Sequence, residues 1–213
     1  MKLFISVAAI SLCLIFCSAS IHTNSDEWIS LFNGKSLEGW KVGANAETFK
    51  VEDGMIVVNG ETAHLFYDGD VQDHNFKNFE FKADVMTTPG SNSGIYFHTA
   101  YQESGWPAKG YEVQVNNSHT DWRRTGGLYA IDDVKEVFVK DNEWFTEYIK
   151  VEGKRVIIKL NDKTVVDYTE PENVERPKDM EGRILSSGTF ALQGHDPKSK
   201  VYFKNIMVKP LPQ

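Results

Sequence analysis

The sequence predicts an all-β protein built as a β-sandwich or barrel, and three observations lead to this fold class. From Trp28 onward, short runs alternate apolar and polar residues, as half-buried strands do. Gly, Asn, Asp and Pro separate the runs, and no stretch keeps a helical period over about three turns. Aromatic residues make up 12% of the chain, a content that favours strands over a helical bundle.

Residues 1–20 predict a secretory signal peptide. Lys2 gives a positive start, an almost wholly apolar stretch runs to Cys17, and small residues follow around Ala19. Both cysteines lie inside this segment, so its removal leaves an exported chain, periplasmic or secreted, with neither a disulfide nor a thiolate ligand. Two alternatives stay open: a buried N-terminal helix, and a lipoprotein anchored through Cys17. The second is disfavoured because Phe16 stands where such signals carry a small residue.

Residues 21–27 are polar and predict a loose leader, and residues 28–213 predict one domain. A chain of 213 residues is long enough to bury the core of a large all-β domain. Charged residues at 25% and hydrophobic residues at 41% exclude wholesale disorder. The net charge of −7 disfavours nucleic acid as a partner, and no stretch of the domain is apolar enough to span a membrane. The sequence does not indicate the oligomeric state.

The clearest expected strand covers residues 76–85, where Phe79 and Phe81 share one face with other apolar residues and charged residues occupy the opposite face. We expect these two rings to be buried between two sheets, together with Phe190 and Leu192. The other expected strands, in chain order, cover residues 48–51, 55–58, 95–98, 111–115, 145–151, 155–160, 164–168, 188–193 and 200–208.

Three of these strands each present a row of polar side chains, since successive residues of a strand point to opposite faces. The rows are Tyr96 with His98, then Glu112 with Gln114 and Asn116, and last Gln193 with His195. Neighbouring loops add Trp106, Lys109, Trp122 and Arg124. These acid, amide, imidazole and aromatic groups predict a carbohydrate site, because acids and amides hydrogen-bond hydroxyls and aromatic rings stack on the C–H face of a sugar. Each residue alone also fits a solvated strand face or a turn, so the prediction rests on the convergence of the rows.

Other motifs of catalysis or metal binding are missing from the sequence. It contains no HExxH or CxxC, no phosphate-binding loop and no Gly-x-Ser-x-Gly elbow. His64, His74 and His119 have no supporting pattern. Residues 170–183 are polar, carry two prolines and predict one long surface loop.

Six short motifs occur in order along the domain: 31–40 (LFNGKSLEGW), 92–97 (NSGIYF), 110–115 (GYEVQV), 125–129 (TGGLY), 192–195 (LQGH) and 203–206 (FKNI). In these motifs the chain resembles the 3-keto-disaccharide hydrolase domain family, formerly a domain of unknown function, over roughly residues 28–210. The resemblance implies a concanavalin-like jelly-roll β-sandwich of two antiparallel sheets, similar to laminarinase-type glucanases. It also implies a hydrolase of carbohydrate metabolism, a glycosidase that acts on 3-keto glycosides and 3-keto disaccharides. With the signal peptide over residues 1–20, we expect this enzyme to be exported. Many members carry Arg where this chain has His98 and Lys204.

The residues around Glu112 favour elimination over ordinary double displacement. A retaining glycosidase needs two carboxylates about 5 to 5.5 Å apart, yet the partners of Glu112 on its strand are the amides Gln114 and Asn116. In a 3-keto sugar the ketone acidifies the C2 proton, so a base can remove it and the substituent at C1 can leave. Water then adds back, which gives net hydrolysis. We expect Glu112 and His195 to be the catalytic acid and base, in either order.

The other groups of the site are expected to bind the sugar. The expected substrate-binding residues are Tyr96, His98, Trp106, Lys109, Gln114, Asn116, Trp122, Arg124 and Gln193. One of their side chains, or a divalent metal held by His98, Glu112 and His195, has to stabilise the ketone oxygen. The sequence establishes no cofactor.

Two other functions remain open on the same fold. A non-catalytic carbohydrate-binding, lectin-like module would use the same aromatic and amide groups. A conventional glycoside hydrolase is disfavoured by the single carboxylate of the polar rows. An acid and a histidine that converge on one face would favour an enzyme over a lectin.

Overall fold

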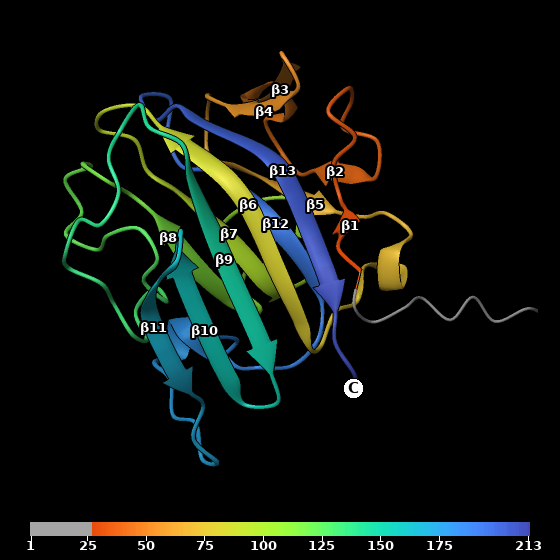
Figure 1. Ribbon diagram of the computed structural model, residues 1–213, viewed down its shortest axis with the longest axis vertical. Coiled ribbons are helices and arrows are strands. Elements are labelled where there is room, and N and C mark those ends of the chain that lie inside the picture. Colours follow the sequence, from red (N-terminus) through yellow and green to blue (C-terminus); the bar gives the residue numbers. More distant parts are fainter. Residues whose placement is uncertain (1–26) are drawn as a thin grey trace, which may run out of the picture.

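A computed structural model describes residues 27–213 of this protein (Figure 1). The expected signal peptide over 1–20, its alternative anchor at Cys17 and nearly all of the expected leader lie outside the described residues. Within residues 27–213, no helix is long and apolar enough to cross a membrane.

The strands of the described residues form two antiparallel sheets. The larger sheet has the order β11-β10-β9-β6-β13-β4-β3, with β1 paired to β13, and the smaller has the order β2-β5-β12-β7-β8. The larger sheet contains β1 (Ile29–Ser30), β3 (Phe49–Glu52), β4 (Met55–Val58), β6 (Phe79–Thr87), β9 (Phe145–Glu152), β10 (Arg155–Leu160), β11 (Lys163–Thr169) and β13 (Val201–Pro210). The smaller contains β2 (Trp40–Val42), β5 (Ala63–Tyr67), β7 (Ser93–Thr99), β8 (Tyr111–Val115) and β12 (Thr189–Gly194). The short 3₁₀ helices are η1 (Ala46–Thr48), η2 (Val71–His74) and η3 (Lys178–Met180).

The core lies between the two sheets, where aromatic rings from both layers meet. Figure 1 shows β6, β9 and β13 lying across β7 and β12. Phe190 of β12 packs against Phe79 and Phe81 of β6, with ring centroids 4.8 and 4.6 Å apart. These three side chains and Leu192 are 0% exposed, so their expected burial between the sheets is confirmed. Because side chains alternate along a strand, the residues next to Phe190 and Leu192 point to the outer face of the smaller sheet.

The sequence does not predict three of the strands, β1, β2 and β5. The first two contain two and three residues, too few for a pattern to be visible. In β5 all five residues are buried, so alternation is lost. Its outward-facing His64 and Phe66 are covered by the rings of Trp106 and Tyr101, respectively. The loop that carries these two rings therefore covers one side of the outer face.

One carboxyl group lies inside the core. Glu147 alternates with Phe145 and Ile149 on the inner face of β9 and is 0% exposed. Neither of its oxygens has a hydrogen-bond partner among the described residues. Burial therefore raises the pKa of Glu147 well above its ordinary value of 4.5, and the nearby backbone N–H of Gly126 does not reverse this, because it already donates to the carbonyl of Gln114.

We expect Glu147→Gln to gain stability relative to the unchanged protein as the pH rises from about 5 to about 8. The folded protein binds the Glu147 proton more tightly than the unfolded chain does. The resulting stability is complete below the ordinary pKa and is lost as pH rises toward the raised pKa. Glutamine has no proton to lose. Urea unfolding of both proteins at both pH values measures the effect, and an equal difference in unfolding free energy at the two values would contradict it.

Candidate active site

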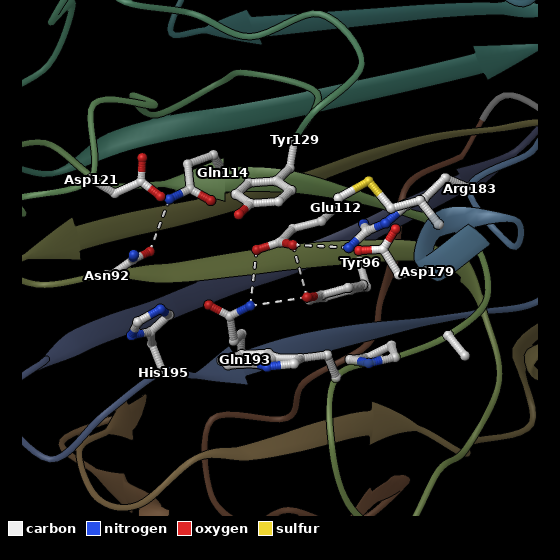
Figure 2. Close-up of a pocket in the computed structure, with 14 residues that line it drawn as sticks. Asn92, Tyr96, Glu112, Gln114, Asp121, Tyr129, Asp179, Arg183, Gln193 and His195 are labelled. Atoms are coloured by element: carbon white, nitrogen blue, oxygen red, sulfur yellow. Dashed lines mark hydrogen bonds and ion pairs between the residues drawn. The ribbon is translucent and has the colours of Figure 1, made fainter. Parts of the chain in front are cut away.

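The outer face of the smaller sheet carries a cavity of about 370 Å³ (Figure 2). This volume lies in the range of small-molecule sites. Strands β7, β8 and β12 form its floor, and loops around Trp106 and Asp179 contribute to its walls. The lining residues are Asn92, Tyr96, Trp106, Pro107, Ala108, Glu112, Gln114, Asp121, Tyr129, Asp179, Met180, Arg183, Gln193 and His195.

Glu112 lies at the centre of a hydrogen-bond cluster in this cavity. Its Oε2 accepts a hydrogen bond from the Tyr96 hydroxyl at 2.8 Å, and its Oε1 accepts one from Gln193 Nε2 at 2.9 Å. The guanidinium of Arg183 approaches Oε2 at 3.4 Å. Figure 2 shows these three donors converging on the carboxylate from different elements of the fold. The cluster joins β8, β7 and β12 through their outward-facing side chains.

The carboxylate reaches Gln193 because Gly94 leaves room for it. Glu112 lies on β8 and Gln193 on β12, and β7 runs between these two strands. A Cβ added at Gly94 of β7 would lie 2.7 Å from Glu112 Oε1 and 2.9 Å from its Cγ. The backbone of Gly94 is not in the left-handed region, so the strand itself accepts another residue. What requires glycine at this position is the carboxylate above it.

We expect Gly94→Ala to leave the fold intact. If the Glu112 carboxylate takes part in a reaction in this cavity, the substitution should lower kcat of that reaction by about 10²-fold, because a displacement of about 1 Å in a reacting group can cost that much. The added methyl group would push the Glu112 carboxylate away from Gln193 without removing any polar group. Steady-state kinetics and thermal unfolding measure the two effects. Unchanged kcat would show that the reaction does not depend on the position of the Glu112 carboxylate.

The electrostatics of the cluster suit proton transfer. Burial raises the pKa of Glu112, while the charge of Arg183 and the hydrogen bonds from Tyr96 and Gln193 oppose the rise without cancelling it. Burial and the neighbouring Glu112 also raise the pKa of Tyr96 well above its ordinary value, so its hydroxyl stays a neutral donor. A carboxyl group with a raised pKa holds its proton to a higher pH than an exposed carboxyl group does, which suits it to proton transfer.

Three fully buried polar atoms of the cavity residues have no hydrogen-bond partner within residues 27–213. They are the side-chain carbonyl oxygens of Gln114 and Gln193 and one terminal nitrogen of Arg183, Nη1. Gln114 itself is held in place, because its Nε2 donates to Asn92 Oδ1 at 2.9 Å. Buried polar groups normally have partners. The cavity therefore offers two acceptors and one charged donor to a polar ligand.

An imidazole and an indole ring also line the cavity. His195 follows directly after β12, and its ring lies 5.5 Å from that of Trp106, at an interplanar angle of 41°. The Trp106 side chain is 49% exposed, so it still has free ring surface. Indole faces bind the C–H face of a sugar.

The structure brings together six of the residues expected at the site. Glu112, His195, Tyr96, Trp106, Gln114 and Gln193 all line the cavity. The remaining expected binding residues, His98, Lys109, Asn116, Trp122 and Arg124, do not line it.

His98 is excluded by a β-bulge in β7. Tyr96 pairs with Ala191, but Thr99 pairs with Thr189, so β7 has one extra residue between these pairs. His98 takes the left-handed conformation there, with φ 56°, and alternation is interrupted. Its Nε2 donates to the carbonyl of Lys77 at 2.8 Å, and burial lowers its pKa to about 4. His98 therefore lies outside the cavity lining, where its ring is hydrogen-bonded to the backbone beside the core.

The side chains of the other four residues contact loops near the cavity rather than its interior. Asn116 and Arg124 bind backbone carbonyls of the turn over 119–123, including that of Asp121 at 3.0 Å from Asn116 Nδ2. Lys109 Nζ donates to the carbonyl of Ser187 at 2.7 Å. Trp122 is exposed and lies under the guanidinium of Arg123. None of these side chains lines the cavity.

Arg183 is the main site residue that sequence reasoning missed. It lies in the stretch expected to be a surface loop, and this loop also brings Asp179 and Met180 to the lining of the cavity. Arg176 Nε donates to the Arg183 carbonyl at 2.8 Å, and Gly110 N donates to Gly182 O at 2.9 Å. Asn92, Asp121 and Tyr129 were also missed, although Asn92 and Tyr129 belong to two of the six motifs.

The expected metal ligands do not come together, because His98 points away from the cavity. A different set, His119, His195 and Asp196, places one ligand atom each within 4.8 Å of the others. Two imidazoles and a carboxylate are donors that zinc and similar cations accept. Whether this set is free to bind a cation depends on the hydrogen bonds that Asp196 already accepts.

The sequence of this chain matches a family and a curated relative. The model of the 3-keto-alpha-glucoside-1,2-lyase-like domain family matches residues 27–209. The 3-keto-disaccharide hydrolase of Bacteroides thetaiotaomicron is 30% identical in an alignment 178 residues long, and the match covers 71% of this chain and 61% of that protein. The matched part of this chain thus spans less than two thirds of the length of the relative.

Several solved structures share the fold. A candidate glycosyl hydrolase from Parabacteroides distasonis is similar at a TM-score of 0.72 and 27% identity, covering 87% of this chain and 94% of that one. A family 66 carbohydrate-binding module from Bacillus subtilis has a TM-score of 0.57 at 16% identity and covers 80% and 95%. A family 16 endo-β-1,3(4)-glucanase has a TM-score of 0.53 at 12% identity and covers 86% and 89%. The expected jelly-roll sandwich of two antiparallel sheets is confirmed.

Proposed function

This chain belongs to the family of 3-keto-alpha-glucoside-1,2-lyase-like domains, as its motifs predict, and on that premise we propose that it cleaves the glycosidic bond of 3-keto glycosides and 3-keto disaccharides. The observation that carries the proposal is the environment of Glu112. A buried carboxyl group with a raised pKa lies beside an unpartnered N–H of Arg183, in a cavity with free sugar-binding acceptors. Asp121 and Asp179 also line the cavity, but Asp121 is engaged by Arg123, and Asp179 lies on the exposed η3.

The first half of the proposed reaction is an elimination across C1 and C2. A base takes the C2 proton, and the electron pair of that bond moves to the C3 ketone, whose oxygen becomes an enolate. The Arg183 guanidinium is the donor proposed to stabilise this charge, because its Nη1 has no other partner in the described residues. The C3 carbonyl then re-forms, a C1–C2 double bond appears, and the aglycone oxygen leaves C1 with a proton from the acid.

The second half adds water to the C1–C2 double bond. The hydroxyl joins C1 and the proton returns to C2, so the net result is hydrolysis. The same two groups serve in reverse: the former acid takes the proton from water, and the former base returns its proton to C2. Glu112 and His195 are the two proton-transfer groups, and both line the cavity (Figure 2). Trp106 provides the stacking surface for the sugar ring.

Incubation with 3-keto-trehalose beside trehalose tests the proposal. We expect release of glucose and 3-keto-glucose from the ketone alone. In D₂O we expect deuterium at C2 of the 3-keto-glucose, above the level in solution without enzyme, because elimination removes the original C2 proton. Equal release from trehalose, without deuterium at C2, would make the protein a conventional glycoside hydrolase. Binding of either sugar without release would make it a lectin-like module.

A further inference from the structure

A carboxylate outside the cavity holds the imidazole of His195. Asp196 Oδ2 lies 2.8 Å from His195 Nδ1, and each side chain is 30% exposed. His195 lines the cavity, whereas Asp196 does not. Asp196 therefore lies behind the imidazole, on the side away from a bound sugar.

Asp196 is itself held rigidly by the turn that follows it. Its Oδ2 also accepts a hydrogen bond from the Ser199 hydroxyl at 2.7 Å. Its Oδ1 accepts the backbone N–H groups of Lys198 at 2.9 Å and Ser199 at 3.2 Å. Partial burial alone would raise the pKa of Asp196, but the hydrogen bonds from His195 and Ser199 outweigh it and hold the pKa at about 2. The carboxylate is thus ionised and accepts hydrogen bonds only.

The hydrogen bond to Asp196 determines where the His195 proton lies. An ionised carboxylate cannot donate, so the ring nitrogen that faces it has to be the protonated one. In the neutral imidazole this is Nδ1, which leaves a lone pair on Nε2. Packing against the Trp106 ring limits rotation of the imidazole. An imidazole with a free Nε2 lone pair at the wall of the cavity is suited to accept a proton.

We propose that Asp196 is a positioning residue, which holds His195 in the tautomer whose Nε2 takes the C2 proton of the substrate. This inference rests on the proposed function, and it assigns which of Glu112 and His195 is the base and which is the acid. His195 accepts the proton from C2, and Glu112 donates its carboxyl proton to the leaving oxygen at C1. During hydration Glu112 recovers a proton from water, and His195 returns its proton to C2. No other reactant is needed.

The hydrogen bonds of Asp196 favour this role over metal binding. Its two oxygens already accept four hydrogen bonds, so none of the usual lone-pair directions is free for a cation. His119 Nδ1 similarly accepts the backbone N–H of Asp121 at 3.1 Å, which places the proton of its neutral ring on Nε2. The three side chains lie close together, but Asp196 and His119 already use their acceptor atoms in hydrogen bonds within the protein.

Asp196→Asn tests the proposal with little change in shape. The backbone N–H groups of Lys198 and Ser199 require an acceptor, so the side-chain oxygen of the asparagine should face them. Its NH₂ group then faces His195 Nδ1 and donates to it, which moves the proton of the neutral imidazole to Nε2. We expect kcat on 3-keto-trehalose to fall by about 10²-fold or more, with KM within about twofold. The ¹⁵N chemical shifts of His195, recorded at about pH 9 where an ordinary imidazole is neutral, should indicate Nδ1–H in the unchanged protein and Nε2–H in the variant.

Asp68→Asn is the matched control, because Asp68 forms a second His–Asp pair, with His74 at 3.8 Å, away from the cavity. We expect it to leave kcat and KM unchanged. If the ¹⁵N chemical shifts of the unchanged protein place the His195 proton on Nε2, the proposal is overturned. This measurement does not depend on whether any variant folds. Unchanged kcat in Asp196→Asn would overturn it as well. So would activity of the unchanged protein that a chelator removes and Zn²⁺ restores, since the cluster would then be a metal site.

The two proposals can fail separately. If no 3-keto glycoside is cleaved, the proposed function fails, and with it the role of His195 as a base. The ¹⁵N shifts would still report whether Asp196 sets the tautomer of His195. If 3-keto-trehalose is cleaved but the tautomer does not depend on Asp196, only the positioning role is lost.

Discussion

Glu112→Gln is expected to lower turnover of a 3-keto glycoside by about 10² to 10⁴-fold, the usual loss when a general acid or base is removed. Glutamine keeps the shape of the side chain and one acceptor oxygen for Tyr96 or Arg183. It cannot give or take the proton that the reaction requires. Sugar binding should therefore persist, because Gln114, Gln193 and the Trp106 ring are unchanged.

Initial rates on 3-keto-trehalose give kcat and KM, and calorimetric titration with the same sugar gives the affinity of the inactive variant. Glu136→Gln is a suitable control, because this glutamate is exposed and does not line the cavity. It should behave as the unchanged protein does. Turnover of Glu112→Gln close to that of the control would remove Glu112 from the chemistry and leave it a binding residue.

Phe190→Ala is expected to lower the free energy of unfolding by about 3 to 5 kcal/mol, the typical cost of deleting a buried aromatic ring. Phe190 connects the two sheets, because its ring contacts those of Phe76, Phe79 and Phe81 at centroid distances of 4.7, 4.8 and 4.6 Å. Tightly packed neighbours of this size cannot collapse fully into the space, so a cavity remains.

Urea unfolding followed by near-UV circular dichroism measures this loss. Val137→Ala is the matched truncation at the surface, where the side chain is 52% exposed, and should change stability by no more than about 0.5 kcal/mol. A loss below about 1 kcal/mol for Phe190→Ala would mean that the two sheets repack around the missing ring.

Alternation along strands predicted much of the cavity floor. Alternation assigns Glu112, Gln114, Tyr96 and Gln193 to the polar faces of three separate strands, and the structure places these four side chains on the outer face of one sheet. This works because a strand has a period of two residues, so the apolar neighbours that enter the core leave these side chains outside. The same rule applied to 145–151 would have shown Glu147 on the apolar face, between Phe145 and Ile149.

Alternation fails where the backbone is irregular. The bulge at His98 adds one residue to β7. As a result, the His98 side chain does not point to the same side as Tyr96, contrary to what strict alternation predicts. In β5 the pattern disappears because a loop covers the outer face and buries His64 as well as Leu65. Neither effect is visible in a short stretch of sequence, since each depends on a partner strand or loop far along the chain.

The sequence by itself determined the all-β class, the apolar rows of the core and the outward polar side chains of the regular parts of β7, β8 and β12, because these follow from the two-residue period of a strand. Only the tertiary structure decided that β12 and β8 lie on either side of β7, that Gly94 lets Glu112 reach Gln193, and that the loop over 170–187 brings Arg183 to the carboxylate. The physical reason is that strand order and loop docking depend on contacts between residues as distant as Glu112 and Arg183. No local pattern of residues encodes such contacts.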